Sequence, residues 1–137
     1  MRRIACLSLL FAFSLFPSER ARGETFAELS AAYLNESPKL SPVSATQLGD
    51  HRYDDQLDQI SSVSRDRRRK FARGYLARLA SLEQEKLSAD ERIDFELLQH
   101  DLRSQLFLID EFRQWEWNPL VYTGLAGNAI YGLMARD

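Results

Sequence analysis

Residues 88–109, SADERIDFELLQHDLRSQLFLI, carry the strongest structural signal in this chain. Ser88 and, three residues later, Glu91 form a capping box, which predicts that a helix begins there. A stripe of apolar residues at helical spacing follows this cap and extends the predicted helix to about residue 114: Phe95, Leu98, Leu102, Leu106 and Ile109. Because residues 106–109 are apolar on every side, this turn needs packing partners in every direction.

The segments before this helix also show helical periodicity. Residues 65–85 predict a second helix through another apolar stripe, Phe71, Tyr75, Leu79 and Leu82. Residues 24–35 predict a helix with an apolar side formed by Phe26, Leu29, Tyr33 and Leu34. Residues 42–48 predict a short helix, with Pro42 at its first position and Gly49 as its cap. Residues 50–64 lack a period and predict an ordered loop. With no strand pattern in competition, the predicted fold class is all-α.

Residues 117–135, WNPLVYTGLAGNAIYGLMA, contain no charged side chain. Their length would allow a membrane span. The polar residues Asn118 and Asn128, with Pro119 between them, argue against a span. We interpret the segment as a core helix of a larger helical protein. Attachment to a membrane through this segment is the other possibility, and it predicts that the processed chain needs detergent to stay in solution.

Residues 1–23 have the order of a secretory signal peptide. Two arginines, Arg2 and Arg3, precede an uncharged apolar run over residues 4–16, and small residues up to Gly23 predict cleavage there. The run is too short to span a bilayer comfortably. Cys6 lies too early in the run for a lipid-attachment cysteine, so a lipoprotein is not expected. The sequence therefore predicts export to the periplasm or the extracellular space, with no stable membrane span after processing.

Composition and motifs exclude several classes of function. The chain has 18 Lys and Arg against 20 Asp and Glu, a formal charge of -2, which provides no long-range attraction to nucleic acid. The basic run over residues 67–70 is interpreted as a solvated helix face. His51 lies among carboxylates, but neither zinc-ligand spacing nor a calcium loop is present, and a hydrogen-bonded turn is favoured. The sequence predicts no catalytic residue, no metal ligand and no cofactor site in this chain.

A series of segments resembles the amino-terminal part of the bacterial domain-of-unknown-function 885 family. The resemblance begins with residues 42–54, PVSATQLGDHRYD, and continues through Leu57 and Ser61. It then includes residues 87–94, which open the capped helix, and residues 117–122, from the Trp-Asn-Pro to a tyrosine. In this order the segments span roughly residues 24–137.

Members of that family are largely helical proteins several times longer than this chain. Their later part carries a His-Glu…Pro-Gly-His-His segment, which has led to a metallopeptidase-like interpretation. The resemblance therefore implies zinc and a peptide substrate in a full-length protein. No proline of this chain belongs to such a segment, so no catalytic residue carries over. What the resemblance implies here is the helical scaffold and a wall of the substrate cleft that includes His51 and Tyr53.

Two functional hypotheses follow. In the first, residues 24–137 are the amino-terminal fragment of an exported metallopeptidase-like hydrolase, inactive alone because the metal-binding segment is missing. Its partner is then the remainder of its own polypeptide or another hydrophobic partner. In the alternative, the chain is a small non-enzymatic helical envelope protein, a binding or structural module that folds cooperatively by itself.

Overall fold

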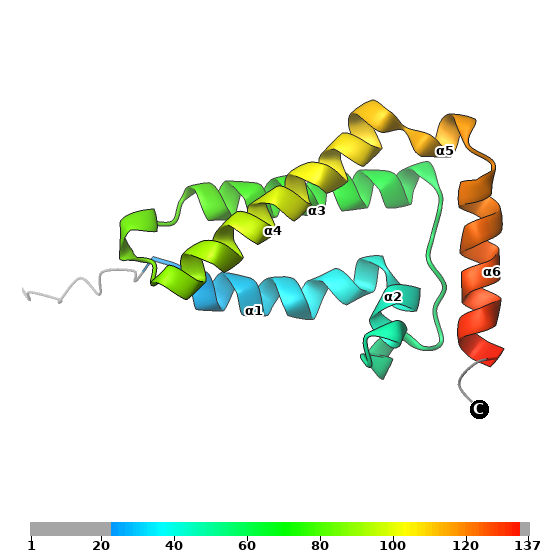
Figure 1. Cartoon of the computed structure of the whole chain (residues 1–137), viewed down its shortest axis with the longest axis horizontal. Coiled ribbons are helices and arrows are strands. Elements are labelled where there is room, and N and C mark those ends of the chain that lie inside the picture. Colours follow the sequence, from blue (N-terminus) through cyan, green and yellow to red (C-terminus); the bar gives the residue numbers. More distant parts are fainter. Residues whose placement is uncertain (1–22, 135–137) are drawn as a thin grey trace, which may run out of the picture.

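The computed structural model describes residues 23–134, and its elements are all helical (Figure 1). The α-helices are α1 (Phe26–Glu36), α2 (Pro42–Gln47), α3 (Ser62–Ala80), α4 (Ala89–Phe107), α5 (Gln114–Trp117) and α6 (Leu120–Met134). The described residues contain no strand, which confirms the all-α prediction. Residues 1–22 of the predicted signal peptide lie outside the described residues.

The core lies between α1, α3 and α4. Figure 1 shows α4 crossing in front of α3, with α1 running alongside α3 below it, and all three helices contact one another. Each contributes one fully buried leucine, namely Leu29, Leu79 and Leu102. Full burial of one such side chain stabilises the fold by roughly 1.5–3 kcal/mol. The predicted stripes of residues 65–85 and 88–109 therefore face this core, as expected.

Aromatic rings extend the core toward the end of α1. Tyr33 lies 5.7 Å from Phe71 and 5.3 Å from Tyr75 between ring centroids, while Phe26 lies 6.2 Å from Phe95. Tilted and edge-on pairs of this kind stabilise a core beyond the area that they bury. The prediction was wrong for Leu34, whose side chain is 68% exposed. It follows Tyr33 directly and so lies about a quarter turn away, outside the contact with α3 and α4.

Side-chain caps mark the beginnings of α1, α3 and α4. The Ser88 capping box is confirmed, because the Glu91 N–H donates to Ser88 Oγ at 3.2 Å and the Ser88 N–H donates to the Glu91 carboxylate at 2.9 Å. Thr25 forms a second capping box at the start of α1. Helix α3 begins at Ser62, three residues before the predicted start, because Ser61 Oγ accepts from the Ser64 N–H at 3.1 Å.

Two helix ends differ from the prediction. Helix α3 stops at Ala80 instead of residue 85, and the 3-10 turn η3 (Gln84–Lys86) leads back into α4. Helix α4 does not continue to residue 114 as a regular α-helix, since it widens into the π-helix η4 (Leu108–Phe112) and ends at Arg113, with φ of 46°. Arg69 and Arg73 of α3 hold Asp110 of this π-turn, at 2.6 and 3.1 Å.

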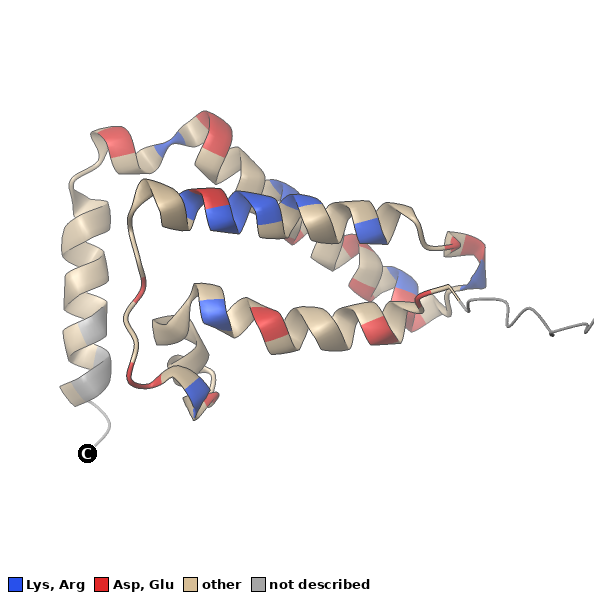
Figure 2. Cartoon of the chain, turned by 180° about the vertical axis from the view of Figure 1, so that it is seen from behind, with Lys and Arg blue, Asp and Glu red and all other residues tan. Residues whose placement is uncertain are grey.

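Charges are distributed unevenly over the fold, as Figure 2 shows, with Lys and Arg concentrated along α3. Several of these arginines are paired with carboxylates on other elements: Arg69 and Arg73 with Asp110, and Arg78 with Glu24. The Arg69 guanidinium also lowers the pKa of the Asp110 carboxyl. Part of the basic face therefore fastens α3 to its neighbours, which the prediction of a solvated face did not include.

The carboxy-terminal third of the fold exposes large apolar side chains. On α6, which contacts α2 and α5, the exposed fraction reaches 71% for Leu120 and 72% for Tyr131. Leu108, in the turn predicted to be apolar on every side, is 49% exposed. Among the described residues, no helix has both the length and the apolar character that crossing a membrane requires.

Candidate functional site

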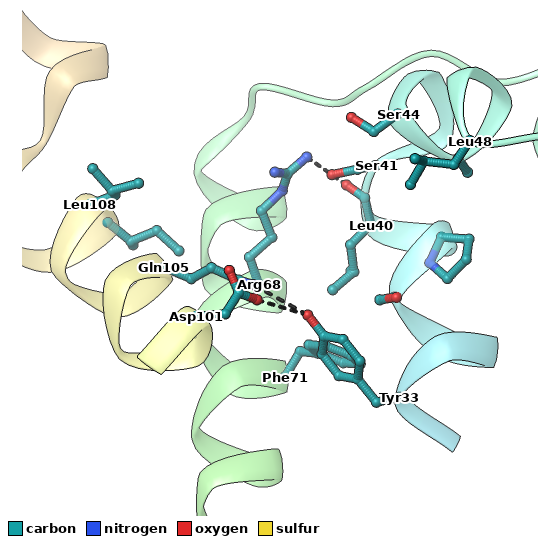
Figure 3. A pocket seen from close by; sticks show the side chains of 14 residues that line it. Tyr33, Leu40, Ser41, Ser44, Leu48, Arg68, Phe71, Asp101, Gln105 and Leu108 are labelled. Carbon is teal, nitrogen blue, oxygen red and sulfur yellow. Dashed lines mark hydrogen bonds between the residues drawn. The ribbon is translucent and has the colours of Figure 1, made fainter. Parts of the chain in front are cut away.

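A groove of about 590 Å³ lies where α1, α2, α3 and α4 meet (Figure 3). One wall comes from the end of α1 and from the 3-10 turn η1 (Ser37–Leu40) and α2, with the serines Ser37, Ser41 and Ser44. The opposite wall comes from α4 and its π-turn, with Asp101, Gln105, Leu108 and Ile109. Arg68 and Phe71 of α3, with Tyr33 of α1, complete the lining. The groove thus combines apolar surface with a cation, an anion and several hydroxyls.

Tyr33, Asp101 and Gln105 form a hydrogen-bonded group on the α4 side of the groove. Figure 3 shows the Tyr33 hydroxyl pointing at Asp101, to whose Oδ2 it donates at 3.0 Å. The Gln105 amide donates to the same oxygen at 2.7 Å. Burial raises the pKa of the Tyr33 phenol to about 12, and the Asp101 carboxylate adds to the rise. At neutral pH the phenol therefore stays protonated and acts as a donor to Asp101.

Arg68 supplies the positive charge of the groove. Its side chain extends from α3 toward α2, and its guanidinium donates to the backbone carbonyl of Leu40 (Figure 3). A guanidinium has five N–H donors in a fixed fork, so one hydrogen bond leaves most of them available. Within residues 23–134, no ion pair joins Arg68 to Asp101. The polar side chains of the lining can form hydrogen bonds with carbonyl, amide and hydroxyl groups of another molecule. We therefore treat the groove as a candidate binding site.

The two residues that the family resemblance suggested for a cleft wall lie in a different place. His51 and Tyr53 belong to the 3-10 turn η2 (His51–Tyr53), which follows the turn at Gly49, where φ is 89°. His51 Nδ1 lies 3.0 Å from Asp54 Oδ2, and the His51 side chain is 63% exposed. The structure therefore places both residues outside the groove of Figure 3, and their role in the cleft of a longer protein stays a prediction.

The turn containing these residues is held by its own polar side chains. Arg52 pairs with Asp50 at 2.7 Å and also donates to Asn35 at the end of α1. Asp54 accepts a hydrogen bond from the Thr46 hydroxyl of α2. This is the hydrogen-bonded turn that the sequence favoured over a metal site. In the part of the chain that the structure describes, no group of three or more His, Cys, Asp or Glu side chains is placed to hold a metal ion.

Zinc, which the family resemblance implies for a full-length protein, therefore does not fit the residues described here. The only two histidines of the sequence, His51 and His100, lie on η2 and α4, and both are exposed. No step of a metal-dependent reaction can be assigned to these side chains.

The groove residues were not singled out by the sequence. Arg68 belongs to the basic run interpreted as a solvated face, and Tyr33 was assigned to the core only. Asp101 and Gln105 lie four residues apart on α4, a spacing that puts both on one face of a helix. This spacing was the available signal, but only packing shows that this face looks toward α1 and α2.

Comparisons with known proteins agree with the helical architecture. Residues 42–136 match a family described as bacterial protein of unknown function, DUF885. A solved structure from Shewanella oneidensis, described as "a putative lipoprotein of unknown function", is similar to this chain with a TM-score of 0.76 and 28% sequence identity. That similarity covers 83% of this chain and 20% of the other, so this chain spans about a fifth of the length of that relative.

Among curated proteins, no match to this sequence was found. The family match extends from the first residue of α2 through the whole of α6 and covers more than half of the chain. The chain therefore belongs to the DUF885 family of bacterial proteins of unknown function.

Proposed function

We propose that this chain is the amino-terminal helical portion of a larger exported hydrolase of metallopeptidase type, to which it contributes scaffold and no metal ligand. The observation that carries this proposal is the difference in length between this chain and its structural relative. The chain aligns with 83% of its own residues to only 20% of the Shewanella relative. A reaction centre supplied by the other part of such a protein agrees with the lack of a metal-binding group among residues 23–134.

The exposed apolar surface supports the same proposal. Phe112 and Trp117 pack edge to face, 5.4 Å apart, on a surface where they are 41% and 59% exposed. Exposed large apolar side chains continue along α6 up to Met134. Large exposed apolar surfaces are uncommon on monomeric soluble domains and often mark an interface. We infer that the remainder of the polypeptide covers this surface.

An envelope location is part of the proposal. The relative is described as "a putative lipoprotein of unknown function", and the segment over residues 1–23 of this chain has the order of a signal peptide. For this chain we propose cleavage near Gly23 and release into the periplasm or the extracellular space. Fractionation of cells that produce a tagged complete gene product tests this, because retention in the cytoplasm contradicts it.

The enzymatic part is tested with the complete gene product and a mixture of peptides analysed by mass spectrometry. We expect hydrolysis that a chelator abolishes and zinc restores, and no hydrolysis by residues 24–137 alone. Activity of the short piece, or no hydrolysis of any peptide by the complete product, contradicts the proposal.

A matched pair of variants tests the proposed cleft wall. In the complete gene product, His51→Ala is expected to raise KM more than it lowers kcat, since the residue would contact substrate without taking part in the reaction. The control is His100→Ala, which removes the second exposed histidine of the chain, located on α4. It should leave both constants unchanged. Equal effects of the two substitutions would contradict a role for His51 in the cleft.

A further inference from the structure

The groove of Figure 3 contains two opposite charges that are not neutralised by each other. Asp101 accepts hydrogen bonds from Tyr33 and Gln105, both neutral, and Arg68 donates to the uncharged carbonyl of Leu40. Both hydrogen bonds to Asp101 end on Oδ2. Within the described residues, Oδ1 of this carboxylate and most of the Arg68 donors thus remain available to a bound molecule.

The position of each charge is defined by its neighbours. Asp101 is oriented by a phenol whose raised pKa keeps it protonated and by an amide four residues along the same helix. Arg68 is anchored through the backbone of Leu40, where η1 ends. Preorganised groups of this kind bind a ligand without first ordering their own side chains, which lowers the entropic cost of association.

Apolar side chains and hydroxyl groups line the same groove as these charges. Leu40 and Leu48 line one wall, and Leu108 and Ile109 line the other. Ser41 and Ser44 belong to the same wall as the Leu40 carbonyl to which Arg68 donates (Figure 3). A molecule that fits this lining has a positive end, a negative end and an aliphatic body. Short peptides with free termini and apolar side chains have this combination.

We propose that the groove binds a short zwitterionic peptide with aliphatic side chains. Its ammonium group pairs with Asp101, its carboxylate pairs with Arg68 and accepts from the serine hydroxyls, and its side chains lie against Leu40 and Leu108. Charge complementarity selects this occupant, because a purely anionic ligand meets Asp101 and a purely cationic one meets Arg68. The inference does not depend on the hydrolase proposal, since it concerns binding and includes no reaction step.

The test is isothermal titration calorimetry of the dipeptide leucyl-leucine into the complete gene product, with a chelator present so that hydrolysis does not interfere. We expect saturable binding that weakens about tenfold or more for N-acetyl-leucyl-leucine and for leucyl-leucine amide, because each lacks one charge-assisted contact. Absence of saturable binding overturns the proposal, and so does equal binding of the free and blocked peptides. In that case a segment of the remaining polypeptide is the candidate occupant of the groove.

Substitutions assign each end of the ligand to its residue. Asp101→Asn should remove the preference for the free amino terminus over the acetylated one, and Arg68→Gln should remove the preference for the free carboxylate over the amide. Arg67→Gln and Asp94→Asn make the same changes at exposed positions of α3 and α4 and should leave both preferences unchanged. If the Asp101→Asn and Arg68→Gln variants still prefer free termini to blocked ones, binding occurs elsewhere and the proposal fails.

A failed binding test leaves the proposed function intact, because hydrolysis is measured separately and without chelator. Conversely, binding of leucyl-leucine that depends on Asp101 and Arg68, without any hydrolysis, supports this groove and contradicts the hydrolase. On the unaltered protein, the blocked peptides test whether both charged ends of the ligand are needed, and equal binding of free and blocked peptides overturns the proposal even if a variant does not fold.

Discussion

At the scale of single residues, the capping box of α4 shows how a local signal acts. Ser88 and Glu91 exchange hydrogen bonds with each other's backbone, and the Ser88 N–H is the first cause that lowers the pKa of the Glu91 carboxyl. These contacts satisfy N–H groups that the first turn of a helix otherwise leaves without partners. They need no tertiary partner, which is why the sequence was sufficient to predict them.

The cap predicts the behaviour of a peptide that spans residues 86–107. Replacing Ser88 with Ala should lower its helicity, measured by far-UV circular dichroism, by an amount equivalent to about 0.5–1 kcal/mol. The control is Ser104→Ala, inside the same helix, which should maintain or raise helicity because Ala has the higher helix propensity. Equal effects of the two substitutions would mean that the capping box does not stabilise α4.

Tyr33 predicts a pH dependence of stability at high pH. Its pKa is raised in the folded protein from the usual value of 10.0 to about 12, chiefly by burial. A group with a raised folded pKa contributes stability that is fully present below its unfolded pKa and is lost as pH rises through the folded value. Stability should therefore fall between about pH 10 and pH 12.

The measurement is an ultraviolet absorbance titration of the tyrosines alongside unfolding curves at each pH. Tyr33→Phe should remove a component that titrates near pH 12 and reduce the loss of stability over this range. If the component removed by the substitution titrates near pH 10, the phenol is not held by burial and by Asp101 as described.

At the scale of elements, α4 and α6 show that neighbouring elements influence how a helix ends and how much of it is buried. The stripe of α4 predicted which side packs, but not the change to a π-turn at Leu108, where Asp110 pairs with Arg69 and Arg73 of α3. Helix α6 carries no charge, and several of its leucine, isoleucine and tyrosine side chains are exposed. The uncharged sequence of α6 predicted a buried helix. In the described structure, large apolar side chains of α6 are exposed to solvent.

This exposure predicts opposite effects of one substitution in two contexts. Leu120→Lys should raise the solubility of residues 24–137, because it removes a side chain that is 71% exposed. In the complete gene product the same substitution should lower the thermal midpoint, since there a lysine would have to be buried in an interface.

Thr123→Lys is the matched control, because it adds the same charge at an exposed polar position of α6. It should raise the solubility of the short piece less than Leu120→Lys does. Solubility gains of the same size from both would indicate a general effect of charge, and an unchanged midpoint in the complete product would contradict the covered surface.

At the scale of the whole molecule, stability depends on whether this apolar surface is covered. Burial contributes about 25 cal/mol per Å² of apolar surface, so several large exposed side chains forgo several kcal/mol. A typical domain is stable by only about 5–15 kcal/mol. Three helices share a core around Leu29, Leu79 and Leu102, but α6 and the π-turn add little to it.

Residues 24–137 alone are therefore expected to be helical by far-UV circular dichroism but to melt without a sharp transition and to bind a hydrophobic dye, as loosely packed states do. The complete gene product should melt cooperatively and bind no dye. A cooperative melt of the short piece without dye binding would instead support the complete, non-enzymatic envelope module.

The sequence by itself determined the all-α class, the capping box of α4, the short helix that begins at Pro42 and the core stripes of α3 and α4. These features depend on spacing and on contacts within a few residues, and such information is local. Only the tertiary structure decided that Tyr33, Arg68 and Asp101 line one groove and that Leu34 faces solvent. Residues from three helices meet according to how the helices cross, and crossing depends on the packing of all their side chains at once.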